Sequence, residues 1–162
     1  PEKNPLFVPP VSTFEPTKKD ANVPNINTIP GEDVFYMDCR ILPHYRLEDV
    51  EGRVQAACRS IEKKFGVTIT TESMQRAKAA PPTPPGSAVV EALKRAIQAV
   101  YQKESRPIGI GGGTVAAYFR REGFEAACWS KIDDTAHQPN EYCLIDNMVG
   151  DAKVFAHIMM QE

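Results

Sequence analysis

The stretch Ala79-Ala80-Pro81-Pro82-Thr83-Pro84-Pro85-Gly86 stands at the middle of the 162-residue chain. Its four prolines lack backbone donors and fix an extended conformation, which neither a helix interior nor a sheet interior tolerates. We therefore place a domain boundary here. One domain is expected over residues 1–80, and a second segment over residues 81–162.

The first part of the chain predicts the order β-β-α-β. Residues 11–18 and 34–42 are rich in strand-forming residues and predict an antiparallel pair. From Leu47 to Phe65, apolar residues recur every three to four positions and Gly66 follows, which indicates an amphipathic helix with a glycine stop. Residues 67–73 alternate apolar and polar side chains, as a strand with one buried face does. This order matches a ferredoxin-like plait without its first strand and helix.

The second part alternates predicted helices with short apolar strands, which indicates an α/β layer. The fold class is therefore α/β and α+β, a partial plait followed by an α/β segment. The last predicted helix carries an apolar stripe of Met148, Ala152, Phe155 and Met159. The expected helices cover residues 87–102, 115–121 and 146–160, and the expected strands cover residues 107–110 and 124–130.

The composition fits a globular protein and excludes some functions. Hydrophobic residues make up 42% and charged residues 25% of the chain, and the net charge of -2 includes no basic block. We therefore expect no nucleic-acid partner. No apolar run approaches the roughly 18 to 20 residues that span a bilayer, so no membrane contact is expected and a cytoplasmic location is predicted. The four cysteines lack close CxxC spacing and are expected to be reduced and buried.

The loop over residues 131–141 carries the densest group of potential metal ligands. It contains Asp133, Asp134, His137, Asn140 and Glu141. Carboxylate and imidazole groups are the ligand types of divalent metals, and amides often support them. The same residue types also make ordinary solvated turns, so the loop chemistry by itself leaves both readings open.

Two further segments suggest anion binding. The run Gly109-Ile110-Gly111-Gly112-Gly113-Thr114 is predicted to join a strand to a helix, where backbone N–H groups can hold an anion and Thr114 adds a hydroxyl. A tight connection with unusual backbone angles is the alternative. Arg40 lies in the second predicted strand, where its planar fork could meet a carboxylate or simply pair on the sheet surface.

Taken in order, these segments resemble a family of co-catalytic zinc hydrolases. It contains acetylornithine deacetylases, succinyl-diaminopimelate desuccinylases, aminoacylases and glutamate carboxypeptidases. The resemblance runs from about residue 11 to the end of the chain. It rests on three segments in this order: Asn27-Thr28-Ile29-Pro30-Gly31-Glu32 with Asp38-Cys39-Arg40-Ile41-Leu42-Pro43, then Gly111-Gly112-Gly113-Thr114, then His137-Gln138-Pro139-Asn140-Glu141.

The resemblance implies roles for individual residues. His137 matches the last zinc-binding histidine of the family, and Asn27 matches a lid residue that reaches the active site of the partner subunit. A substrate carboxylate would be held by Arg40 and Thr114 with the Gly112 and Gly113 backbone. Asp133 falls near a substrate-contacting position.

The resemblance also implies an architecture and a reaction. Residues 1–80 would form most of a lid that makes a homodimer, and residues 81–162 the end of a catalytic domain. Two zinc ions, with cobalt or manganese as possible substitutes, would activate water against an N-acyl or peptide amide next to a free carboxylate.

One histidine cannot hold a catalytic zinc, which takes about three protein ligands. The other ligands and the general base are expected upstream, so no catalytic base is assigned here and this piece alone is expected to be inactive. The alternatives are a non-catalytic module that binds a small anion and a dimerisation module.

Overall fold

The computed structural model describes residues 2–161 and has a mixed α/β fold, as predicted. The chain forms two compact units, which are described separately here. Unit 1 comprises the chain up to Ala79 together with Gly109–Gly112, and unit 2 comprises Ala80–Ile108 and the chain from Gly113 onward. The division after Ala79 falls at the start of the proline-rich stretch.

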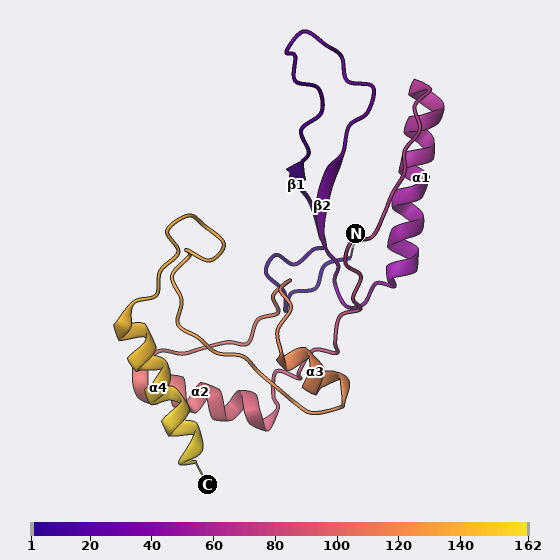
Figure 1. Ribbon diagram of the computed structural model, residues 1–162. Coiled ribbons are helices and arrows are strands. Elements are labelled where there is room, and N and C mark those ends of the chain that lie inside the picture. The colour runs from indigo at the N-terminus through magenta and orange to yellow at the C-terminus, as the bar shows by residue number, and fades with distance from the viewer. Residues whose placement is uncertain (1, 162) are drawn as a thin grey trace. The chain divides into compact units, whose positions relative to one another are not determined.

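Unit 1 is built on an antiparallel hairpin of β1 (Thr13–Lys19) and β2 (Phe35–Arg40) (Figure 1). Thr13 pairs with Arg40 at one end of the ladder, and Lys19 pairs with Phe35 at the other. The register shifts between Pro16 and Lys18, where proline has no N–H to donate to the ladder. A long loop over residues 20–34 joins the strands, so Arg40 and this loop lie at opposite ends of the hairpin.

Helix α1 (Leu47–Phe65) follows the hairpin and has the predicted bounds. Glu48 and Asp49 lie in its first turn and Lys63 and Lys64 in its last, which complements the helix dipole at both ends. Gly66 ends the helix with φ 66°, and its N–H donates to the Glu62 carbonyl at 2.8 Å. Such a left-handed cap is where glycine has no steric penalty.

The apolar face of α1 is largely exposed within the described residues. No residue of the helix is buried, and within residues 2–161 it packs on neither strand of the hairpin. Ile61 is 45% and Phe65 63% exposed. The amphipathic pattern therefore predicted the helix correctly. The described residues contain no element that buries its apolar stripe.

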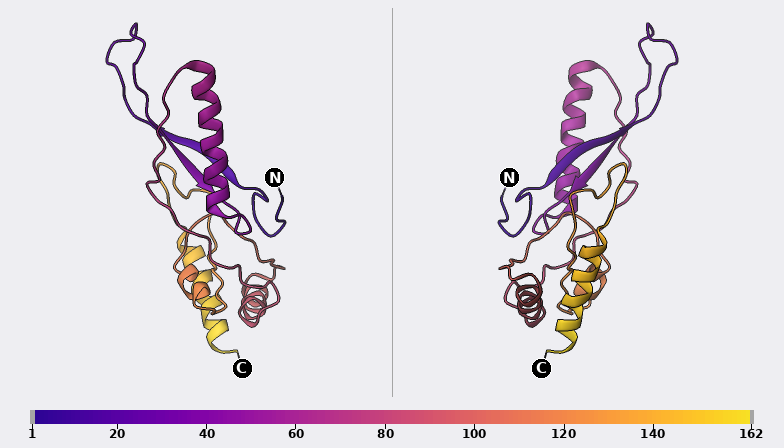
Figure 2. Two further views of the ribbon diagram at one scale, coloured as in Figure 1. Left: turned by 90° about the vertical axis from the view of Figure 1, so that its right-hand side faces the viewer. Right: turned by 90° about the vertical axis from the view of Figure 1, so that its left-hand side faces the viewer.

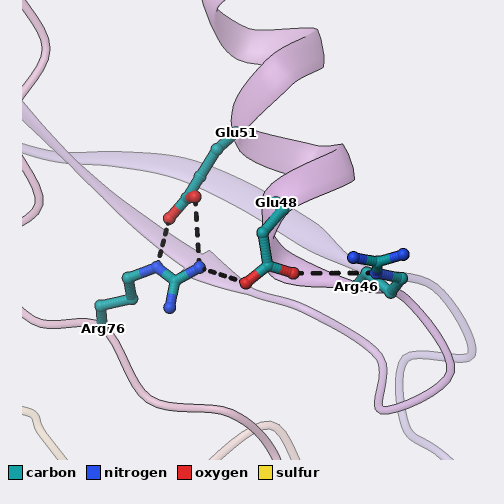
Figure 3. Close-up of polar contacts among 4 residues, drawn as sticks. All are labelled: Arg46, Glu48, Glu51 and Arg76. Carbon is teal, nitrogen blue, oxygen red and sulfur yellow. Dashed lines mark hydrogen bonds and ion pairs between the residues drawn. The ribbon is translucent and has the colours of Figure 1, made fainter.

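The segment after α1 is not a strand, in contrast to the prediction for residues 67–73. A strand needs a neighbour for its N–H and C=O groups, and no described strand pairs with this segment. Side chains of α1 hold it instead. The Ile69 N–H donates to Glu62 Oε1 at 2.8 Å, and Arg76 bonds to both Glu48 and Glu51 (Figure 3).

Unit 2 contains α2 (Ala88–Tyr101), α3 (Ala116–Arg121) and α4 (Ile145–Met159). Helices α2 and α4 pack against each other. Figure 2 shows α2 nearly end-on beside α4. Ala96, Ile97 and Val154 form the buried cluster, with Val154 0% exposed. Around it pack Leu93, Val100, Tyr101, Trp129 and Ile158.

The apolar stripe predicted for the last helix does not face this core. Met148 is 60%, Phe155 45% and Met159 83% exposed, and the buried residues of α4 are Asn147, Gly150 and Val154. Gly150 permits the close crossing, because a Cβ there would lie 2.0 Å from the Tyr101 hydroxyl. A polar residue and a glycine thus occupy the packed face, which a hydrophobic pattern cannot reveal.

Two other predicted strands are also absent from the described residues. Residues 107–110 contribute only an isolated bridge between Gly109 and Phe7, and residues 124–130 have no strand partner. Thr83 of the proline-rich stretch substitutes for a neighbouring strand. Its hydroxyl donates to the Ala126 carbonyl at 2.6 Å and accepts from the Ala126 N–H at 3.2 Å.

The cysteines are free, as expected, but Cys39, Cys128 and Cys143 are exposed and Cys58 is half-buried, so the expectation of buried thiols is wrong. No helix among the described residues combines the length and apolar character needed to cross a membrane.

Candidate functional site

Arg40 is the last residue of β2, and its side chain is held in place by two acceptors within unit 1. Its Nη1 donates to the Gly111 carbonyl at 3.0 Å, and its Nη2 bonds to the Asp38 carboxylate. The close approach favours a glycine, because a Cβ at position 111 would lie 3.2 Å from the Arg40 Cβ, which is a tight contact. The structure therefore joins two of the sequence segments that were singled out, 71 residues apart.

Arg40 remains half-exposed, with 49% of its side chain accessible to solvent. A guanidinium carries five N–H donors in a planar fork, so these two acceptors leave donors for a further anion. Gly112 follows directly and is exposed. Asp38 was not predicted as a site residue, although its position two residues from Arg40 on the same strand face signals the pairing.

Asn27 lies in the loop at the far end of the hairpin from Arg40 and is exposed. The neck of that loop is fixed by the Asp20 N–H, which donates to the Val34 carbonyl at 3.0 Å. The Tyr36 hydroxyl donates to Asp20 Oδ2 at 3.0 Å, and Lys18 pairs with the same carboxylate. The hydrogen bond from Lys18 is the main cause that lowers the pKa of Asp20, and the bond from Tyr36 is the second.

In unit 2, Gly113 is exposed and Thr114 is half-buried just before α3. The Thr114 carbonyl accepts from the Ala117 N–H at 3.0 Å, so this residue starts the first turn of the helix. The predicted glycine loop therefore does lead into a helix, and Thr114 stands at its entry. The carboxylate-binding role of these residues stays a prediction.

The loop that carries His137 is stabilised by its own hydrogen bonds. The His137 N–H donates to Glu141 Oε2 at 3.3 Å, and Gln138 Nε2 donates to the Asp134 carbonyl at 2.6 Å. His137 and Asn140 have φ values of 61° and 62°, a region uncommon for residues other than glycine. The loop is thus a defined turn and not an arbitrary polar connection.

The metal-binding role of His137 stays a prediction, and its side chain is accessible for it. Its side chain is exposed, and its ring nitrogens make no hydrogen bond to any residue within 2–161. A neutral imidazole nitrogen of this kind is a common metal ligand. In the same described range, no three His, Cys, Asp or Glu side chains lie close enough to hold a metal ion together.

Asp133 belongs to the same loop but is already engaged. Its Oδ2 accepts a hydrogen bond from Asn147 Nδ2 of α4 at 3.2 Å. Asp151, one turn further along α4, accepts bonds from the Ser130 hydroxyl and the Lys131 N–H. Neither Asn147 nor Asp151 was predicted as a site residue; the available signal was a polar pair four residues apart on one helix face.

Comparison with known proteins identifies the family. The profile of peptidase family M20/M25/M40 matches residues 11–161. The chain belongs to this family. An uncharacterized metallohydrolase of Methanococcus maripaludis is 43% identical over an alignment 169 positions long, and the alignment covers 96% of this chain and 40% of that protein.

A second relative agrees with the first. An uncharacterized metallohydrolase of Methanocaldococcus jannaschii is 38% identical over an alignment 166 positions long, and the alignment covers 98% of this chain and 40% of that protein. The chain therefore spans about 40% of the length of these M20/M25/M40 relatives. No solved structure matches it significantly. The resemblance stated from the motifs is thus confirmed at the level of the family and not of a subfamily.

Proposed function

We propose that the whole protein is a zinc-dependent amidohydrolase that cleaves an N-acyl or peptide amide next to a free carboxylate. Deacylases, desuccinylases and exopeptidases share this reaction class. The proposal is supported by membership in family M20/M25/M40 and by two relatives named metallohydrolases. The observation that carries the substrate class is the bond between Arg40 and Gly111, which places a cationic fork beside a glycine-rich loop.

In this proposal, Arg40 binds the carboxylate of the substrate. The bonds to Gly111 and Asp38 restrict the side chain, so less rotamer entropy is lost when it binds a ligand. The family resemblance also assigns Gly112, Gly113 and Thr114 to carboxylate binding, through backbone N–H groups and a hydroxyl. A small N-acyl amino acid or a short peptide is the ligand that this set of donors would recognise.

His137 would supply one ligand to a pair of zinc ions. The zinc that His137 would help to hold would supply Lewis-acid activation of the amide carbonyl and of the attacking water. The remaining ligands and the general base are proposed to come from parts of the protein outside this chain. The chain alone is therefore proposed to be inactive.

The hairpin geometry supports a homodimer in which Asn27 serves the partner subunit. Arg40 and Asn27 lie at opposite ends of the hairpin, so one rigid hairpin does not present both residues to a single ligand. Exchange between two copies would bring Asn27 of one subunit to the site of the other. Residues 1–80 would then act as a lid and dimerisation domain.

A substrate panel on the whole protein tests the reaction class. N-acetyl amino acids, N-succinyl amino acids and dipeptides would be compared with the same compounds carrying a C-terminal amide. We expect hydrolysis of acids and a loss of kcat/KM for amides. Arg40→Ala should lower kcat/KM for acids by the equivalent of about 1.5 to 3 kcal/mol, the value of a hydrogen bond to a charged group, and should not affect amides.

Arg106→Ala is a matched control, because it removes an exposed arginine of unit 2. An equal preference for acids and amides in the wild type would contradict the proposed carboxylate recognition. Absence of any amide hydrolysis in the presence of zinc would contradict the proposed reaction itself.

A dimerisation module without catalysis is a second candidate, favoured by the largely exposed apolar face of α1. It requires a stable symmetric dimer that takes up no zinc. Light scattering combined with zinc analysis of the whole protein distinguishes it from the enzyme.

A further inference from the structure

Helix α4 holds the loop that carries His137 through two polar side chains. Asn147 is 3% exposed, and its amide donates to Asp133 Oδ2 at 3.2 Å. Asp151 accepts from the Ser130 hydroxyl at 2.9 Å and from the Lys131 N–H at 3.0 Å. The start of the loop and the residue four positions before His137 are therefore bonded to the same helix.

The two side chains can act together because they are four residues apart and share a face of α4. That face also carries Gly150 and Val154, which are buried. The core packing of α4 therefore fixes the position from which Asn147 and Asp151 reach the loop. Three residues separate the loop from helix α4, and the carbonyl of its N-cap residue Leu144 accepts from the Asn147 N–H at 3.0 Å.

The conformation at His137 needs such support. Its φ of 61° is costly for a residue with a Cβ and persists only where the surroundings hold it. The Thr135 N–H donates to the Asp133 carbonyl at 2.7 Å, and the His137 N–H donates to Glu141. Asp133 is thus bonded to Thr135, which lies two positions before His137. A displacement of Asp133 would therefore also shift His137.

We infer that Asn147 and Asp151 are positioning residues for His137, and that Asp133 acts through Asn147 as the anchor of the loop and not as a contact to substrate. This inference rests on the proposed function, because it assigns the anchored loop to the placement of a metal-ligating imidazole. The role inferred for Asp133 differs from the one that the family resemblance implies.

The test uses the whole protein and measures zinc affinity by competition with a chelator. We expect Asn147→Ala to weaken zinc binding by roughly tenfold or more, as loss of a partner outside the ligand set typically does. Asp151→Ala should act in the same direction. The matched control is Asp146→Ala, which removes a carboxylate from the same helix, where the structure shows no bond to the loop.

An exchanged pair separates anchoring from substrate contact. The double variant Asp133→Asn with Asn147→Asp keeps an amide-to-carboxylate bond with the two groups reversed. If Asp133 is an anchor, the double variant should recover zinc affinity and kcat/KM to within about threefold of the wild type. If Asp133 contacts substrate, zinc affinity recovers while KM stays raised, and that result would overturn the inferred role.

Hydrogen exchange of the loop provides a readout that needs no zinc. The amides of residues 133–141 should exchange faster in Asn147→Ala and return to the wild-type rate in the exchanged pair. Unchanged exchange in Asn147→Ala would refute the anchoring even if the variant were less stable. A wild-type protein that takes up no zinc but shows the predicted exchange pattern would refute the proposed function and leave the anchoring intact.

Discussion

Helices α1 and α2 have the same kind of amphipathic pattern but different surroundings. Helix α2 buries Val90, Ala96 and Ile97 against the core of unit 2, whereas no residue of α1 is buried. Helix α1 has complementary charges in both end turns, whereas α2 has no basic residue in its last turn. Helix α1 therefore relies on local interactions and α2 on tertiary packing, which is the larger source of helix stability in most proteins.

The largest expected contrast comes from matched isoleucines on the two helices. Ile97→Ala removes a side chain that is 5% exposed and should lower the free energy of unfolding by about 2 to 5 kcal/mol. Ile61→Ala removes one that is 45% exposed and should change it by less than about 0.5 kcal/mol.

Urea unfolding measures this contrast, with circular dichroism for helix content and Trp129 fluorescence for unit 2. Trp129 is the only tryptophan and packs on the α2–α4 cluster. Similar costs for the two substitutions in the 162-residue chain would show that α1 is packed, and the comparison would fail.

A second contrast uses one glycine from a packed helix and one from the unpacked helix. Gly150→Ala places a Cβ against the Tyr101 hydroxyl and should cost about 1 to 3 kcal/mol through overpacking. Gly52→Ala meets nothing within 4 Å and should stabilise α1 by about 0.5 to 1 kcal/mol. Thermal unfolding of both variants measures the difference in sign.

The reason for the Gly150 cost can be checked separately. The Tyr101 hydroxyl is buried without a hydrogen-bond partner among the described residues, and burial is the main cause that raises its pKa. Tyr101→Phe removes the atom closest to the added methyl group, so it should restore part of the stability lost in Gly150→Ala. No restoration would place the clash elsewhere.

The smallest expected effect concerns the charged cluster of Arg46, Glu48, Glu51 and Arg76, which ties the segment after α1 to the helix (Figure 3). The hydrogen bond from Arg76 lowers the pKa of Glu48 in the folded chain. The stabilisation is therefore present above the ordinary glutamate pKa of about 4.3 and is lost as the pH falls through the lower folded value.

Hydrogen exchange of residues 67–76 at neutral and at acidic pH measures this effect. Exchange relative to a reference peptide should accelerate at acidic pH, and added salt should produce a similar change at neutral pH because the pairs are exposed. Arg76→Ala should abolish both dependences. A pH response that persists in this variant would assign it to other groups.

The sequence predicted the features that depend on local patterns. Helix α1 and its Gly66 stop are correct because periodicity, charged end turns and a glycine all act within the segment itself. The helix predicted over residues 87–102 agrees with α2 to within one residue at each end for the same reason. The strand at residues 67–73 was not, because strand formation depends on a neighbour that the local pattern cannot supply.

The site shows the same division. The motifs identified Arg40 and the glycine loop as two separate segments. Only the folded structure shows that Arg40 is bonded to Gly111. Asn147 was missed because a hydrophobic pattern assigns the buried face of α4 to Met148 and Phe155, which are exposed. A polar residue on a packed helix face becomes recognisable only when its partner, here Asp133, is located.

The central claim is that His137 is a zinc ligand of a metallohydrolase. Its most direct test is the zinc content of the whole protein, measured after dialysis in the wild type and in His137→Ala, with His157→Ala as the control histidine on α4. We predict about two zinc ions per wild-type subunit, the number of a two-metal site, no change in His157→Ala, and loss of at least one ion in His137→Ala. Full zinc occupancy in His137→Ala would contradict the claim.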